Sequence, residues 1–126
     1  MVSRFGVLAD ILEEWRAAFD ARKVDEIVAL FAEDVLFQGL SPQLLEGRAR
    51  VRTYYENVPP GTTATVEVLH SRPVAADALA GFATVTFTEA AGTALPVRLS
   101  VVAQHLDGAW RIRQYHVSRL SPAPAG

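Results

Sequence analysis

The sequence predicts an α+β domain in which a layer of helices covers one face of an antiparallel sheet. Apolar residues recur at the spacing of amphipathic helices before Asn57, and they alternate with polar residues, as in β-strands, after Gly61. Asp107-Gly108 separates two alternating runs, which is typical of a β-hairpin. Helices followed by a long antiparallel meander define the α+β class. We expect three N-terminal helices packed on a curved sheet of four long strands plus one short strand.

The helical region contains three apolar stripes. The first runs over residues 5–19 and the second over 27–34, and both have the spacing of helices. Residues 35–37 form the short strand. Turn-forming residues over 39–43 indicate a loop, and a third helix is expected over 47–58, where two prolines stop it. The four long strands are expected over 63–72, 78–89, 95–106 and 109–120.

Length and composition limit the classes of function. With 126 residues, half of them apolar, the chain is expected to form a single domain over 1–120 with a flexible tail at 121–126. A net charge of −2 with mixed signs gives no general attraction for nucleic acid or an anionic membrane. The absence of cysteine excludes disulfides and thiolate metal sites. No signal peptide or membrane span is evident, so we expect a cytoplasmic protein.

Two stretches carry a resemblance to a known family. "AAFDARKVDEIVALFAEDVLF", followed by a loop and "GRARVRTYYEN", resembles the NTF2-like superfamily, which includes ketosteroid isomerases and SnoaL-like polyketide cyclases. The likeness resumes more weakly in "ATVTF" and "DGAWRIRQYHVS". It implies a cone-shaped cavity that takes a small hydrophobic molecule. The same fold hosts isomerases, dehydratases, cyclases, transport factors and assembly domains, so it does not specify the function.

The catalytic residues of ketosteroid isomerases do not carry over. The resemblance aligns the catalytic aspartate of that enzyme with Gly39 and the oxyanion-hole tyrosine with Trp15. A supporting tyrosine aligns with Phe31, and Tyr55 alone remains from the tyrosine network. A carboxylate base and a short hydrogen-bond donor network are both missing. We therefore expect no steroid isomerisation by that mechanism.

Several apolar and aromatic residues are candidates for a ligand-binding wall. The resemblance places Trp15 and Tyr55 beside the pocket, where their rings suit a flat hydrophobic ligand. The alternative is that these residues form ordinary core, because amphipathic helices must bury one face. The full set of candidates is Trp15, Phe19, Phe37, Tyr54, Tyr55, Val85 and Phe87.

His70 and Tyr115 are the candidate catalytic residues. His70 follows Val66 and Val68 on the apolar face of its strand, and a buried imidazole can act as acid or base near neutral pH. It can equally be a hydrogen-bonded histidine at a strand end. If Asp107-Gly108 is a two-residue turn, Tyr115 shares a face with Ser100; a three-residue loop places it with Val101 instead. The resemblance favours the Tyr115 face as the concave one.

The pattern predicts more apolar surface on one face of the long strands than three helices can cover. This surface is formed by Leu99, Val101, Trp110 and Ile112. Ile112 is expected on the other face of its strand from Tyr115. We therefore expect a homodimer packed through the sheet.

His70, His105 and His116 lack the spacing of metal ligands, and no glycine-rich phosphate loop is present, so neither a metal nor a cofactor is expected.

These observations favour a protein that binds a small hydrophobic molecule. As an enzyme it would be a cofactor-independent cyclase, isomerase or dehydratase acting on a hydrophobic cyclic substrate in secondary metabolism, with His70 and Tyr115 moving protons. The alternative is a ligand-binding or dimerisation module without catalysis.

Overall fold

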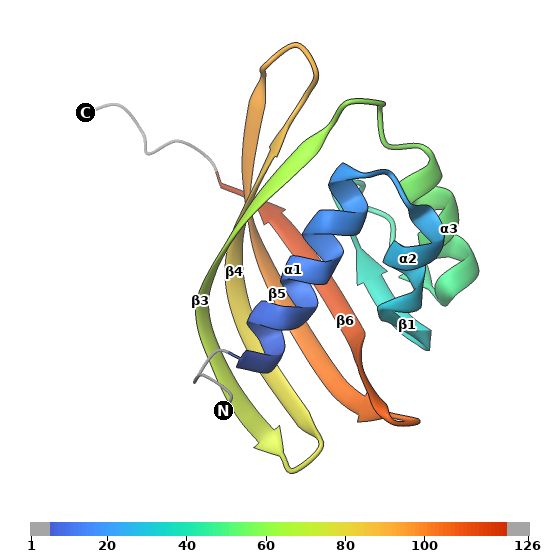
Figure 1. The fold of residues 1–126 in the computed structure, drawn as a ribbon, viewed down its shortest axis with the longest axis vertical. Coiled ribbons are helices and arrows are strands. Elements are labelled where there is room, and N and C mark those ends of the chain that lie inside the picture. The colour runs from blue at the N-terminus through green and yellow to red at the C-terminus, as the bar shows by residue number, and fades with distance from the viewer. Residues whose placement is uncertain (1–5, 121–126) are drawn as a thin grey trace.

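The computed structural model describes residues 6–120, and the tail expected at 121–126 lies outside the described residues. Three helices, α1 (Gly6–Asp20), α2 (Val24–Ala29) and α3 (Arg48–Glu56), lie on the concave side of one curved sheet (Figure 1). This arrangement confirms the α+β class. Within residues 6–120, none of the helices combines the length and apolar character that a membrane crossing requires.

The sheet has six strands in the order β2-β1-β6-β5-β4-β3. The strands are β1 (Phe31–Gln38), β2 (Leu45–Glu46), β3 (Thr63–Ala75), β4 (Ala78–Thr88), β5 (Ala94–Leu106) and β6 (Ala109–Arg119). All neighbouring pairs are antiparallel except β1 and β6, which are parallel. The expected count of four long strands plus one short strand is therefore wrong, because β2 adds a strand and β1 has eight residues.

The boundary between α2 and β1 differs from the expectation. The apolar run that indicated a longer helix is divided: α2 ends at Ala29, and Phe31 already pairs with Ile112 of β6. Phe31 is completely buried in this strand. The burial available beside β6 therefore outweighs the helical spacing of Phe31 with Ile27 and Val28.

Helix α1 lies across the concave face of the sheet, where its apolar stripe forms the core (Figure 1). Gly81 of β4 allows this close approach, because a Cβ atom there would overlap Leu8 of α1 and the His70 carbonyl of β3. At the end of α1, the Asp20 carboxylate accepts a hydrogen bond from the Ala64 amide at 2.8 Å. The helix thus approaches β4 closely near its start and is joined to β3 at its end.

A β-bulge in β6 resolves the two alternatives for the last hairpin. Leu106 pairs with Ala109, so Asp107-Gly108 is a two-residue turn, yet Tyr115 pairs with Val101 rather than Ser100. Arg113 is the extra residue between these two parts of the ladder. The bulge turns both Ile112 and Tyr115 toward the core, although they are three residues apart. The expectation that Ile112 points away from Tyr115 is therefore wrong.

The residues expected to form a dimer face lie elsewhere. Leu99, Val101 and Ile112 are at most 1 % exposed and belong to the core beneath the helices. Trp110 packs against the edge of the same core and against the His105 ring. The argument for dimerisation from these four residues is therefore wrong, because three of the four are buried within a single copy.

Candidate functional site

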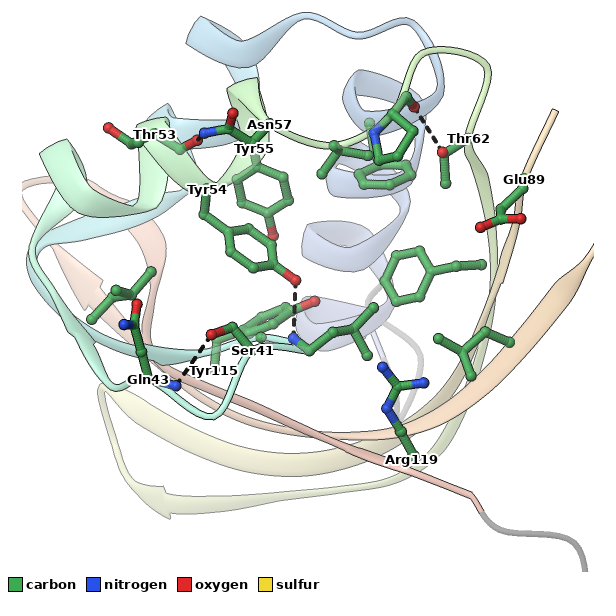
Figure 2. A pocket seen from close by; sticks show the side chains of 18 of the residues that line it. Ser41, Gln43, Thr53, Tyr54, Tyr55, Asn57, Thr62, Glu89, Tyr115 and Arg119 are labelled. Carbon is green, nitrogen blue, oxygen red and sulfur yellow. Dashed lines mark hydrogen bonds between the residues drawn. The ribbon is translucent and has the colours of Figure 1, made fainter.

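A cavity of about 700 Å³ opens between the helices and the concave end of the sheet. Its wall comes from the end of α1, the loop 39–45, α3, the segment 57–62, the β4–β5 end of the sheet and β6 (Figure 2). The volume is in the range of small-molecule sites, which are mostly apolar with a few placed polar groups. Here the apolar wall includes Phe19, Phe87 and Leu95.

Three tyrosines supply the phenol groups of the cavity. Tyr54 and Tyr55 lie next to each other on α3, and Tyr115 reaches the same space from β6. Tyr115 stacks flat on Phe37, with ring centroids 4.5 Å apart. Stacked, tilted and edge-to-face ring contacts join eight aromatic side chains in one cluster, namely Trp15, Phe19, Phe31, Phe37, Tyr54, Tyr55, Phe87 and Tyr115.

Trp15 holds Tyr55 in place from behind the cavity. Its indole N–H donates a hydrogen bond to the Tyr55 hydroxyl oxygen at 2.9 Å. An indole can only donate, so the Tyr55 proton is available to another acceptor.

Burial raises the pKa of Tyr55, and this effect is larger than the lowering that the hydrogen bond from Trp15 causes. Burial likewise raises the pKa of Tyr115, and the neighbouring phenols of Tyr55 and Tyr54 raise it further. Both phenols are therefore neutral hydrogen-bond donors near pH 7.

Tyr54 closes one side of the cavity against the loop at Gly39. The Leu40 amide donates a hydrogen bond to the Tyr54 hydroxyl oxygen at 3.0 Å (Figure 2). A Cβ atom at Gly39 would overlap the Tyr54 hydroxyl, so the phenol occupies the space of a side chain at position 39. The resemblance aligns the catalytic aspartate of ketosteroid isomerases with this position. The site therefore lacks that carboxylate and has no free volume for one.

The charged groups of the cavity lie near its opening. Arg50, Glu89 and Arg119 are lining residues, and all three are exposed. Glu89 is the one carboxylate among the described lining residues, and no histidine lines the cavity. Within residues 6–120, no cluster of three His, Asp or Glu side chains is arranged to hold a metal ion. The deep part of the cavity thus offers phenol donors but no base.

The structure divides the residues expected to bind a ligand into two groups. The cavity wall includes Phe19, Tyr54, Tyr55 and Phe87, together with Tyr115. Trp15, Phe37 and Val85 do not line this cavity and are at most 1 % exposed. These three support the wall from the core, and Phe37 also borders a smaller cavity of about 250 Å³ near β2.

His70 does not reach the cavity, and the expectation that its imidazole is buried on the apolar face of the strand is wrong. A β-bulge at Leu69 shifts the register, so Val68 pairs with Ala83 but His70 pairs with Phe82. Phe82 is 49 % exposed on the convex face, and His70 is exposed beside it. The expected pair of His70 and Tyr115 therefore lies on opposite faces of the sheet.

Sequence reasoning missed Arg119, Arg50 and the backbone of Leu40. Arg119 follows Tyr115 and Val117 at alternate positions, so it was detectable once the face of Tyr115 was known. Arg50 is exposed on α3 at a position that no motif in the sequence marks. The contact of the Leu40 amide depends on the path of a loop, for which the sequence holds no pattern.

The curled, mostly antiparallel sheet with its helical layer, together with the match to a SnoaL-like domain profile, places the chain in the NTF2-like superfamily. The SnoaL-like domain profile matches residues 8–124, and the chain belongs to this family of SnoaL-like domains. No curated protein sequence matches the chain significantly.

Solved structures with the same fold have diverse descriptions. A ketosteroid isomerase-like protein from Erwinia carotovora atroseptica SCRI1043 is 18 % identical, with a TM-score of 0.81 over 97 % of this chain and 100 % of that one. A candidate scytalone dehydratase from Novosphingobium aromaticivorans DSM 12444 is 15 % identical, with a TM-score of 0.81 over 91 % and 83 % of the two chains. A candidate calcium/calmodulin-dependent protein kinase II association domain from Xanthomonas campestris is 22 % identical, with a TM-score of 0.78 over 90 % and 85 %. At these identities the likeness establishes the fold alone.

Proposed function

We propose that the protein binds a small hydrophobic ring compound in the cavity and holds an oxygen atom of that compound with the phenols of Tyr55 and Tyr115. The observation that carries this proposal is the combination of a 700 Å³ space, an aromatic wall and buried neutral donors. The apolar wall removes ring surface from water, and the phenols satisfy the oxygen. Membership of the SnoaL-like family supports a small-molecule role for such a cavity.

Calorimetric titration with 2-tetralone, a neutral bicyclic ketone, tests this proposal. Phe87→Ala removes a ring from the wall and is expected to weaken binding about tenfold. Phe82→Ala removes the same side chain from the opposite face of the same strand, so it is the matched control and should leave the affinity unchanged. Equal effects of the two substitutions, or no binding of 2-tetralone and related bicyclic ketones, would contradict the proposal.

Catalysis is the second candidate function, and one observation favours it. Tyr115 is a protonated donor inside the cavity, while Glu89 is a carboxylate at its opening. A donor at a ketone oxygen and a base near the α-carbon together support enolisation, which is the shared step of many isomerases, cyclases and dehydratases. In this scheme Glu89 takes the α-proton and Tyr115 stabilises the enolate oxygen by its hydrogen bond.

Exchange of the 2-tetralone α-protons in D₂O, followed by proton NMR, distinguishes catalysis from binding. An enzyme should accelerate exchange over buffer, and Glu89→Gln should abolish the acceleration while preserving the calorimetric affinity. Asp77→Asn, which changes a carboxylate outside the cavity, is the control. Binding without accelerated exchange would leave a ligand-binding protein without this catalytic activity.

The same proposal includes a homodimer formed through the convex face of the sheet. Phe82 is exposed there, and Ala80 and Val102 form the neighbouring apolar pair. The buried Nε of Arg98 has no hydrogen-bond partner within the described residues, and Glu67 lies two strands away in the same row. A twofold axis between two copies would bring each Glu67 carboxylate to the other copy's unpaired guanidinium.

A further inference from the structure

Arg119 places a positive charge at the wall of an otherwise apolar space. It is the last residue of β6 and pairs with Val97 of β5, on the same face as Tyr115 and Val117. Figure 2 shows its guanidinium directed from the sheet toward the cavity, across from Tyr54. The Leu120 amide donates to the Pro96 carbonyl at 3.2 Å, which fixes the backbone immediately after Arg119. The backbone position of Arg119 is therefore set by the sheet rather than by a loop.

The Arg119 guanidinium has no carboxylate partner within the described part of the chain. Arg16, Arg52 and Arg113 each form an ion pair with an aspartate or glutamate, whereas no carboxylate oxygen of residues 6–120 lies within 4.0 Å of Arg119. Glu89 lines the same cavity without pairing with it. Arg50, the other arginine of the wall, likewise has no carboxylate partner within residues 6–120. The lining thus carries two positive charges and one negative charge.

Tyr54 provides a neutral donor facing this charge. Its hydroxyl oxygen already accepts the Leu40 amide proton, so its own proton remains available to a further acceptor. Burial raises the pKa of Tyr54, while the Leu40 hydrogen bond and the charge of Arg119 lower it. The phenol therefore stays protonated near pH 7 and lies within electrostatic reach of Arg119. Two donors, one of them charged, then face a common space bordered by Phe87 and Leu95.

From this geometry, and on the basis of the binding function proposed above, we infer that the natural ligand is a ring compound with one anionic oxygen group, a carboxylate or an acidic enol, bound between Arg119 and Tyr54. The ring body then lies on Phe19, Phe87 and Leu95, deeper in the cavity. A guanidinium and a phenol both donate to an anionic oxygen, and such charge-assisted hydrogen bonds are stronger than neutral ones. A neutral ligand of the same shape leaves the guanidinium without a counter-charge.

A matched pair of probes tests the charge separately from the ring. 2-Naphthoate and 2-naphthamide have the same ring and nearly the same shape, but only the first is charged at pH 7. The wild-type protein should bind 2-naphthoate about tenfold more tightly, as measured by calorimetry at low ionic strength. Arg119→Gln should remove this preference by weakening 2-naphthoate alone. Arg72→Gln, which removes the same charge from an exposed position outside the cavity, should preserve it.

The outcomes separate this inference from the underlying binding function. Equal affinities for the two probes, or a preference that survives Arg119→Gln, overturn the anionic ligand and leave the hydrophobic cavity as proposed. A preference lost equally in Arg72→Gln reflects the overall charge and also overturns it. Failure of both probes and of 2-tetralone to bind overturns the inference together with the proposed function. Thermal melts of each variant, taken beside the wild type, show that the substituted proteins are folded.

Discussion

Trp15→Ala should destabilise the protein as a core substitution, despite the closeness of the indole to the cavity. The side chain is 0 % exposed and does not line the cavity. It stacks on Phe19 with ring centroids 5.1 Å apart and meets the edge of Phe87 at 6.1 Å. Deleting a buried tryptophan costs about 3–5 kcal/mol, and loss of the hydrogen bond to Tyr55 adds about 1 kcal/mol. We therefore expect a loss of about 5 kcal/mol in the free energy of unfolding.

Urea unfolding followed by far-ultraviolet circular dichroism measures this loss without depending on indole fluorescence. Leu44→Ala is the control, because its side chain is 77 % exposed and lies outside the proposed dimer face, so it should cost under about 1 kcal/mol. If Trp15→Ala does not fold, Trp15→Phe retains most of the ring and should still lose about 2 kcal/mol. A loss below about 2 kcal/mol for Trp15→Ala would refute the reasoning, since it would mean that the indole faces empty space rather than packed side chains.

The other predictions concern the cavity and the assembly. In a spectrophotometric assay, the wild-type protein should not isomerise a Δ5-3-ketosteroid. Gly39→Asp should not introduce that activity, because the new side chain overlaps Tyr54. Turnover above the buffer rate would contradict this explanation of position 39. The folded-state pKa values of Tyr55 and Tyr115 are raised above the ordinary 10.0. The two neutral phenols therefore contribute their full stabilisation below pH 10, and this contribution is lost as the pH rises further. The free energy of unfolding should fall above pH 10 by at most about 2.7 kcal/mol per pH unit for the two groups, and a flat profile would show that the phenols are accessible to solvent. Light scattering should give a dimer mass for the wild type and a monomer mass for Phe82→Glu; a monomeric wild type would disprove the dimer.

The sequence predicted the parts of the fold that depend on local periodicity. The stripe of α1 and the alternation of β4 are both regular, and both are buried as expected. The extent of β1 could not be predicted in this way, because its length depends on parallel pairing with β6, a strand some eighty residues later in the chain. A parallel pair has no turn between its strands that the sequence could reveal.

The cavity was predictable in its aromatic character but not in its boundary. Phe19 and Trp15 lie one helical turn apart on the same stripe, yet only Phe19 lines the space. The difference depends on where packing leaves a void, which is a property of several elements together. Similarly, Tyr54 was a candidate for the wall because of its type, while its contact with the Leu40 amide arises from a loop that approaches the phenol closely at Gly39.

Two β-bulges determine the chemistry that the cavity can perform. The bulge at Leu69 turns His70 to the convex face, and the bulge at Arg113 turns Tyr115 inward. Without the second bulge, the two-residue turn would place Tyr115 on the face of Ser100, away from the cavity. The result is an interior with phenols and no imidazole, so its polar groups can donate protons but cannot abstract them near pH 7. Such an interior stabilises negative charge on a ligand oxygen whether or not a reaction follows. In the proposed enolisation, the proton removed from the ligand passes to Glu89 at the opening, and for this reason the exchange of 2-tetralone protons in Glu89→Gln distinguishes a binding protein from an enzyme.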